Sequence, residues 1–412
     1  MGKYTFFDDP LSDSLIDTHL KCITSEVVDN LSPLSVILGG SFGREEGSVM
    51  REGSAVEILS DYEIGVVTKK FWKRKVIDKL SQNLSSRLKL EVSLFWITPC
   101  RLKYNKLKNL SFGPSLPSIF MYELKTGSRL LYGENYHSSE PINPASLPLW
   151  EGIKLIFNRM AEILTSLPFL LEKEKDTQGL ETIRALRKID KFVLACADAM
   201  LLLIKRYHYS CRERFNRFKE ECPQRLGEIF VEFPEFPSLV AEAVKAKLDS
   251  YLPGERDPCE LWYKIRPIGD RVFRYLIKKE LEIDFGSYQD FSERYLHHPS
   301  LKKGRYNAYH LNFWPIPDTY YENLINTLKL WRAEVPIHRR AIFSIPWGQA
   351  VYSLLPLIIF SFSEEGKISS DVLKTVRKGL SRITYLKPPQ DNPLDELYLL
   401  IGKTFALWKI LC

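Results

Sequence analysis

The sequence predicts an α+β protein, because its first third alternates helices with strands and its remaining two thirds are mainly helical. Apolar residues recur every three or four positions in residues 12–31, and short apolar runs bounded by glycine follow them. Beyond residue 150, long segments keep helical spacing with few strand signals. A stretch rich in proline and serine at residues 138–149 (SSEPINPASLPL) separates the two patterns and is typical of a linker.

The first third contains the elements of a small sheet. Residues 12–31 predict an amphipathic helix with Ser12 or Asp13 as its N-cap. After it we expect a strand at 34–38, a glycine-rich turn, a second strand at 57–67, a helix at 70–88 and a third strand at 89–97. Twenty positions separate Ser41 from Asp61, and this interval leaves room for an inserted hairpin around residues 51–55.

The rest of the chain predicts a succession of helices. We expect them at 150–175, 180–220, 237–250, 259–282, 319–333, 346–362, 370–385 and 393–410. Residues 285–318 interrupt them with aromatic side chains and prolines. We therefore divide the chain into three predicted domains, residues 1–137, 150–284 and 285–412.

Composition narrows the class of protein. The chain has 412 residues, 45% of them hydrophobic and 26% charged, with a net charge of +7. This mild basic bias suits anionic ligands such as nucleotides but does not require a nucleic-acid partner. Seven scattered cysteines without a CxxC pair are typical of reduced thiols, so we expect a cytoplasmic protein. No apolar stretch is long enough to predict a transmembrane segment.

The turn after the first predicted strand reads GGSFGREEGS, residues 39–48. Glycine permits positive φ and lets a ligand approach main-chain N–H groups. Gly40, Ser41 and Arg44 are therefore candidates for holding phosphate oxygens, the last through its guanidinium. A tight connection between strands is the other interpretation of the same residues.

Two carboxylates follow in the next predicted strand (SDYEIGVV). Asp61 and Glu63 are two apart, so both project from one face of a strand whose following residues Ile64, Val66 and Val67 are apolar. Such a pair is costly to desolvate, and a divalent cation such as Mg²⁺ offsets that cost. Glu91 in KLEVSLFWI points away from Leu90 and Val92, which we expect to face the core. If the second and third strands are neighbours, three carboxylates converge and can bind metal for phosphoryl transfer. The alternative is an acidic strand edge facing water.

These parts together resemble the polymerase-beta type nucleotidyltransferase superfamily, and the string GGSFGREEGS…SDYE resembles stand-alone bacterial members of it. The resemblance covers about residues 30–135. It implies a nucleotidyltransferase palm, a small mixed sheet with flanking helices, followed by helical domains. It also implies Mg²⁺ or Mn²⁺ bound by Asp61, Glu63 and Glu91, and a nucleoside triphosphate as substrate.

The predicted function is transfer of a nucleoside monophosphate to a hydroxyl of a small molecule, saccharide or protein, with release of pyrophosphate. Lys191, on a predicted helix, is a candidate for reaching the triphosphate; a solvated helix face is the other interpretation. Tyr207, Ser210, Arg212 and Arg214 form a polar cluster at the predicted end of that helix. They would line an acceptor site, or they are simply the basic residues that are common at a helix C-terminus.

Two further functions stay open. Residues 285–322 carry aromatic side chains among Lys302, Lys303 and Arg305, a pattern that could stack nucleobases in RNA tailing or cyclic-oligonucleotide synthesis. Packing of a helical domain explains the same aromatics, so nucleic acid is not the favoured partner. The other alternative is a non-catalytic nucleotide-binding or interaction protein on the same fold.

Overall fold

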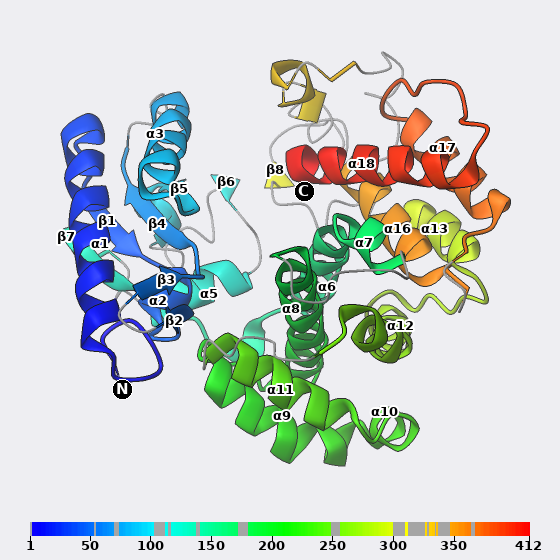
Figure 1. Cartoon of the computed structure of the whole chain (residues 1–412), viewed down its shortest axis with the longest axis horizontal. Coiled ribbons are helices and arrows are strands. Elements are labelled where there is room, and N and C mark those ends of the chain that lie inside the picture. Colours follow the sequence, from blue (N-terminus) through cyan, green and yellow to red (C-terminus); the bar gives the residue numbers. More distant parts are fainter. Residues whose placement is uncertain are drawn as a thin grey trace.

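The computed structural model describes most of the chain. It covers residues 2–52, 55–69, 74–102, 112–113, 117–136, 141–171, 180–248, 256–299, 310–311, 326–327, 329–333, 335–336, 347–363 and 367–412. The protein is a mixed α+β structure with one four-stranded sheet and a larger set of helices. We call residues 2–136 the sheet region and residues 141–412 the helical region; Figure 1 shows the two side by side.

The four-stranded sheet has the order β5-β4-β1-β7. Its strands are β1 (Ser35–Leu38), β4 (Tyr62–Val67), β5 (Val92–Ile97) and β7 (Arg129–Gly133). Strand β1 pairs antiparallel with both β4 and β7, while β4 and β5 are parallel. The second and third strands are therefore neighbours, which meets the condition set for the carboxylates of these strands to come together.

Each face of this sheet has its own apolar cluster. Helices α1 (Pro10–Leu31) and α3 (Arg74–Leu88) cover the face that bears Tyr62, Ile64 and Val92. The other face bears Ile37, Val67 and Ile97 and packs on α5 (Ile119–Thr126) and on α4 (Pro99–Leu102). Alternation along β4 places Asp61 and Glu63 on this second face.

The predicted helix at 12–31 is α1, and its apolar stripe is buried as expected, at Ile16, Leu20, Ile23, Val27 and Leu31. Its predicted N-cap is wrong. The helix begins at Pro10 with Asp9 as N-cap, and Ser12 lies inside the first turn, where its hydroxyl donates to the Asp9 carboxylate. Proline fits the first helical position because its missing N–H has no partner there.

The inserted hairpin between the turn and β4 is present. Strands β2 (Val49–Glu52) and β3 (Ala55–Ile58) pair antiparallel in a separate two-stranded sheet. The strand predicted at 57–67 is thus the end of β3 followed by β4. A short helix, α2 (Gly40–Gly43), occupies the glycine-rich turn itself.

The helical region begins with η3 (Pro144–Ser146). Its helices are α6 (Leu149–Leu164), α7 (Leu167–Leu171), α8 (Leu180–Leu203), α9 (Cys211–Arg225), α10 (Gly227–Glu232), α11 (Phe236–Leu248), α12 (Pro258–Leu281), α13 (Tyr288–His297), α16 (Trp347–Phe360), α17 (Ser370–Ser381) and α18 (Pro393–Leu411). The helix predicted at 180–220 is two helices, α8 and α9, and α10 and α13 were not predicted. The short strands β6 (Phe112–Gly113) and β8 (His310–Leu311) pair with each other.

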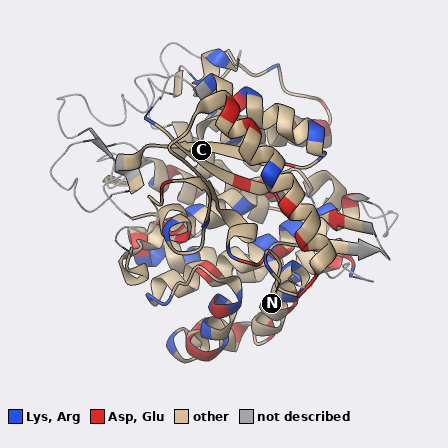
Figure 2. Cartoon of the chain, turned by 90° about the vertical axis from the view of Figure 1, so that its left-hand side faces the viewer, with Lys and Arg blue, Asp and Glu red and all other residues tan. Residues whose placement is uncertain are grey.

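One apolar cluster runs through the helical region. It includes Ile153 of α6, Phe192 of α8, Phe273 of α12 and Val351 of α16. Helices on both sides of residue 285 therefore share a core, and the boundary expected there does not separate two cores. Within the described residues, no helix is both long and apolar enough to cross a bilayer. Figure 2 shows Lys, Arg, Asp and Glu interspersed along the elements, in keeping with the mild net charge.

Candidate functional site

The glycine turn and the acidic strand meet in space. The N–H of Gly39 donates to the carbonyl of Glu63 over 2.8 Å, which continues the β1–β4 ladder. Gly40 has φ +62°, and a Cβ added there would lie 2.8 Å from both Cδ and Oε1 of Glu63. The Glu63 carboxylate thus lies directly against the turn, and any larger residue at position 40 would be strained and would displace it.

Among the residues that the structure describes, Glu63 is a carboxylate without a counterion. Its side chain is half-buried and makes no hydrogen bond or ion pair with the described residues. Burial raises the pKa of Glu63, the neighbouring Asp61 raises it further, and Arg44 only partly opposes this. Because desolvation and a like charge both disfavour the ionised form, the site favours a bound cation or proton.

Asp61 lies immediately before β4 and is exposed. Its neighbours include two basic residues of α8. Arg187 donates from Nη2 to the carbonyl of Leu59 over 2.6 Å. Burial lowers the pKa of Arg187, and the negative charge of Asp61 counteracts this effect. Desolvation lowers the pKa of Lys191, and the negative charges of Glu162 and, more weakly, Asp61 oppose this effect. Its side chain is 54% exposed, so solvent screens these interactions.

A third basic residue, Lys247, comes from the end of α11. Its charge counteracts the raised pKa of Glu63, although it is the weakest of the causes. The carbonyl of Lys247 accepts a 2.5 Å hydrogen bond from Ser48, which fixes the end of α11 against the sheet region. Charges from the helices therefore act on the acidic pair, those of Arg187 and Lys191 on Asp61 and that of Lys247 on Glu63. Of these three residues the sequence pattern singled out only Lys191, because no feature of the sequence indicates that residue 247 lies near the turn.

Ser41 and Glu91 complete the set of predicted residues near the turn. Ser41 is the second residue of α2, half-buried, and its hydroxyl has no partner among the described residues. Glu91 precedes β5, and its carbonyl accepts from the N–H of Tyr62 over 2.9 Å. Continuing the parallel register places Glu91 opposite Asp61, on the predicted face.

The three carboxylates are not gathered into a metal site. Across the part of the chain that the structure describes, no group of three or more His, Cys, Asp or Glu side chains could hold an ion. Glu91 is exposed and lies just before the edge strand β5. The convergence of all three acids on one metal therefore stays a prediction, and the observed geometry brings together Asp61 and Glu63 beside the turn.

Arg44 lies in a different environment from the one predicted. Its side chain is 8% exposed, and Nη1 donates to Oε2 of Glu123 on α5 over 2.8 Å. The guanidinium therefore links α2 to α5, and its Nη1 is occupied by Glu123. Arg214, on α9, contacts the other carboxylate oxygen of Glu123 at 3.2 Å, so two buried arginines share one acid.

Glu46 has a structural role that the sequence did not reveal. Its carboxylate accepts from the N–H groups of Cys211 and Arg212 over 3.0 and 3.3 Å, and from the hydroxyl of Ser210 over 2.8 Å. These are the free donors at the N-terminus of α9. The polar cluster at 207–214 therefore surrounds the start of a helix, and the expectation of a basic helix C-terminus there is wrong.

The residues present fit a divalent cation. Magnesium in phosphate-processing sites is bound by one or two carboxylates, with water and substrate phosphate completing its six ligands. Glu63, without a counterion among the described residues and adjoined by Asp61, provides that donor set. A third carboxylate is not required for a single ion.

Comparison with known proteins found no matching family model, no matching curated protein and no matching solved structure. Function is therefore inferred from the geometry of the site.

Proposed function

We propose that the protein is a metal-dependent nucleotidyltransferase that transfers a nucleoside monophosphate from a nucleoside triphosphate to a hydroxyl. The acceptor would belong to a small molecule, a saccharide or a protein. The observation that carries this proposal is the half-buried Glu63 carboxylate, held against Gly40, with Asp61 beside it and no counterion among the described residues.

The sheet arrangement supports the proposal. Strand β1 ends at the glycine turn, its antiparallel neighbour β4 carries the acidic pair, and the parallel strand β5 begins beside that pair. This is the arrangement expected for the nucleotidyltransferase palm that the sequence resembles. The hairpin β2–β3 accommodates the long interval between Ser41 and Asp61 without separating them from this arrangement.

Asp61 and Glu63 would hold Mg²⁺ or Mn²⁺, which when bound neutralises phosphate charge and activates the acceptor hydroxyl. The hydroxyl of Ser41 and the main-chain N–H groups of the turn would bind phosphate oxygens. Lys191, Arg187 and Lys247 would add positive charge from the helical region. The phosphates would then be bound from two sides, by the metal ion on the acidic pair and by these basic side chains.

The test measures pyrophosphate release. The full chain is incubated with Mg²⁺, each of ATP, GTP, CTP and UTP, and a panel of hydroxyl acceptors. We expect release with at least one nucleotide and a loss of 100-fold or more in the double variant Asp61→Asn, Glu63→Gln. The matched control is Asp78→Asn, which removes an exposed carboxylate from α3 and should leave the rate unchanged. Equal rates in the double variant and the wild type would rule out this assignment.

A second function, nucleotide binding without catalysis, is favoured by one observation. The described residues contain no group of three acids, so a second metal ion has no preformed ligands. Calorimetric titration of the four nucleotides with Mg²⁺ separates the two functions. Saturable binding, without pyrophosphate release from the nucleotide in the presence of any acceptor, would identify a nucleotide-binding protein.

A further inference from the structure

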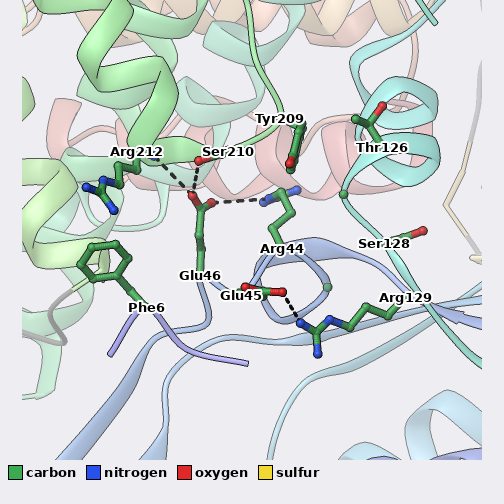
Figure 3. Close-up of a pocket in the computed structure, with 12 residues that line it drawn as sticks. Phe6, Arg44, Glu45, Glu46, Thr126, Ser128, Arg129, Tyr209, Ser210 and Arg212 are labelled. Carbon is green, nitrogen blue, oxygen red and sulfur yellow. Dashed lines mark hydrogen bonds and ion pairs between the residues drawn. The ribbon is translucent and has the colours of Figure 1, made fainter. Parts of the chain in front are cut away.

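A pocket of about 310 Å³ lies at the opposite end of α2 from Glu63. It lies between the sheet region and the start of α9, and its size is at the lower end of the range for small-molecule sites. Figure 3 shows its lining side chains, which come from the N-terminal segment, the end of α2, the start of β7 and the loop before α9. Gly43 and Gly127 contribute backbone to its wall.

The two carboxylates of this pocket are already bound to the protein. Glu45 forms an ion pair with Arg129. Glu46 accepts from Ser210 and from the main chain at the start of α9 (Figure 3). An incoming cation would have to displace these interactions, so the acidic residues do not make this a cation site.

Hydrogen-bond donors in the same wall are left over. Arg212 is exposed; its guanidinium lies 5.4 Å from the Phe6 ring centroid and makes no ion pair or hydrogen bond with the described residues. The Nε of Arg44 is buried and has no hydrogen-bond partner; Oε2 of Glu46 forms an ion pair with it at 3.8 Å, which is beyond hydrogen-bond distance. A buried donor is normally satisfied, so the Nε of Arg44 lacks an acceptor in this wall, while the exposed Arg212 keeps its donors open to a ligand.

We propose that this pocket binds a small anionic ligand through a phosphate or carboxylate group. The planar forks of arginine match both groups, and the Phe6 ring holds the Arg212 guanidinium in place. The lining residues carry three arginines against two carboxylates, a formal charge of +1 before a ligand enters. This proposal does not depend on nucleotidyl transfer, because the pocket shares no side chain with the Asp61–Glu63 pair.

The test is calorimetric titration of the full chain in buffer with EDTA, with inorganic phosphate, pyrophosphate and citrate as separate probes. We expect saturable binding of at least one probe; phosphate and citrate distinguish the two anion chemistries. Arg212→Ala should weaken binding about 10- to 100-fold, the usual effect of removing one charge-assisted hydrogen bond. Arg225→Ala removes the same charge from the far end of α9 and should not change the affinity.

A second variant keeps the charges and fills the space. Thr126 is exposed and lines the pocket, so Thr126→Trp should block the probe without disturbing a core. Unchanged melting temperatures confirm that both variants fold. The double variant Asp61→Asn, Glu63→Gln should bind the probe as the wild type does, which separates this site from the proposed catalytic one. The proposal is overturned if no probe binds at millimolar concentration, or if Arg212→Ala and Thr126→Trp both bind with wild-type affinity.

Discussion

Gly40 and Glu63 show how a single contact can constrain two residue types at once. Position 40 needs a left-handed backbone, and it also has no room for a Cβ beside the Glu63 carboxylate. Glu63 in turn lies where burial and Asp61 oppose its ionisation. A carboxylate kept in such a position reduces stability unless a cation is bound, which is typical of sites selected for function rather than for folding.

Glu63→Gln should therefore stabilise the protein in the absence of metal. The folded pKa of Glu63 is raised above its ordinary value of 4.5, so the native state binds more protons than the unfolded state in the window above that value. Stability in this window falls as pH rises, and the glutamine variant should not show that part of the fall. We expect a gain of about 1 kcal/mol at pH 7 in urea unfolding with EDTA present.

The control for this change is Glu220→Gln on the exposed face of α9, which should leave the pH dependence of the unfolding free energy unchanged. Added Mg²⁺ should stabilise the wild type more than the Glu63→Gln variant, because the ion binds the ionised carboxylate. A variant less stable than the wild type at pH 7 in EDTA would contradict the view that Glu63 is unpaired.

At the scale of elements, the helices and strands that follow from local sequence pattern were predictable. Those that depend on long-range contacts were not. The stripe of α1 was predictable because a 3.6-residue period leaves a clear trace, and the hairpin β2–β3 followed from the length of the interval. The break between α8 and α9 was not predictable, since apolar spacing continues on both sides of it. There Lys205 takes φ +62° and Tyr207 is buried, features that depend on tertiary packing.

The start of α9 depends on a residue 165 positions earlier in the chain. Glu46→Ala removes the acceptor for two main-chain N–H groups and the Ser210 hydroxyl, and it leaves these donors partly buried. We expect a loss of about 2–3 kcal/mol in unfolding free energy and faster hydrogen exchange at Cys211 and Arg212. Urea unfolding and amide exchange measured by NMR or mass spectrometry check the two effects.

Glu45→Ala is the matched control, because it removes the adjacent carboxylate from a half-exposed ion pair with Arg129. Such a pair contributes at most about 1 kcal/mol. If both alanine variants have the same stability and the same exchange at the start of α9, the capping role of Glu46 is excluded.

At the scale of the whole molecule, a buried charge network joins the sheet region to the helical region. Arg44 of the turn and Glu123 of α5 meet Arg214 of α9, which also contacts Asp198 of α8 at 2.7 Å. The hydroxyl of Tyr207 donates to Glu123 over 2.7 Å. Two basic and two acidic side chains balance one another, so the network is stable only while all its members are present.

This network also explains why the site could be predicted only in part. The acidic pair and the turn lie on neighbouring strands, where alternation and adjacency place them together. Arg44 looked like a phosphate ligand because its neighbours are glycines, but its partners Glu123 and Arg214 lie far away in the sequence. Lys247 and Arg187 likewise reach the acidic pair only through the packing of the two regions.

Glu123→Gln should weaken this junction more than the helices themselves. The side chain keeps its shape but leaves two buried arginines with less negative charge, and we expect a loss of about 3–5 kcal/mol. Burial raises the pKa of Glu123, but Arg44 and Arg214 outweigh it and hold the pKa below 4.5. Its contribution is thus present above pH 4.5 and is lost as pH falls through the folded pKa; the variant should lack that acid dependence.

The measurement is urea unfolding followed by two signals, one from a label in the sheet region and one from far-ultraviolet circular dichroism, which the helices dominate. In the variant we expect the two transitions to separate, because the regions are no longer joined by balanced charges. Glu396→Gln is the matched control: it breaks a comparably buried pair with Arg377 that lies wholly between α17 and α18. That variant should lose stability while its two transitions stay together. Coincident transitions in Glu123→Gln would show that apolar contacts, and not the charge network, join the two regions.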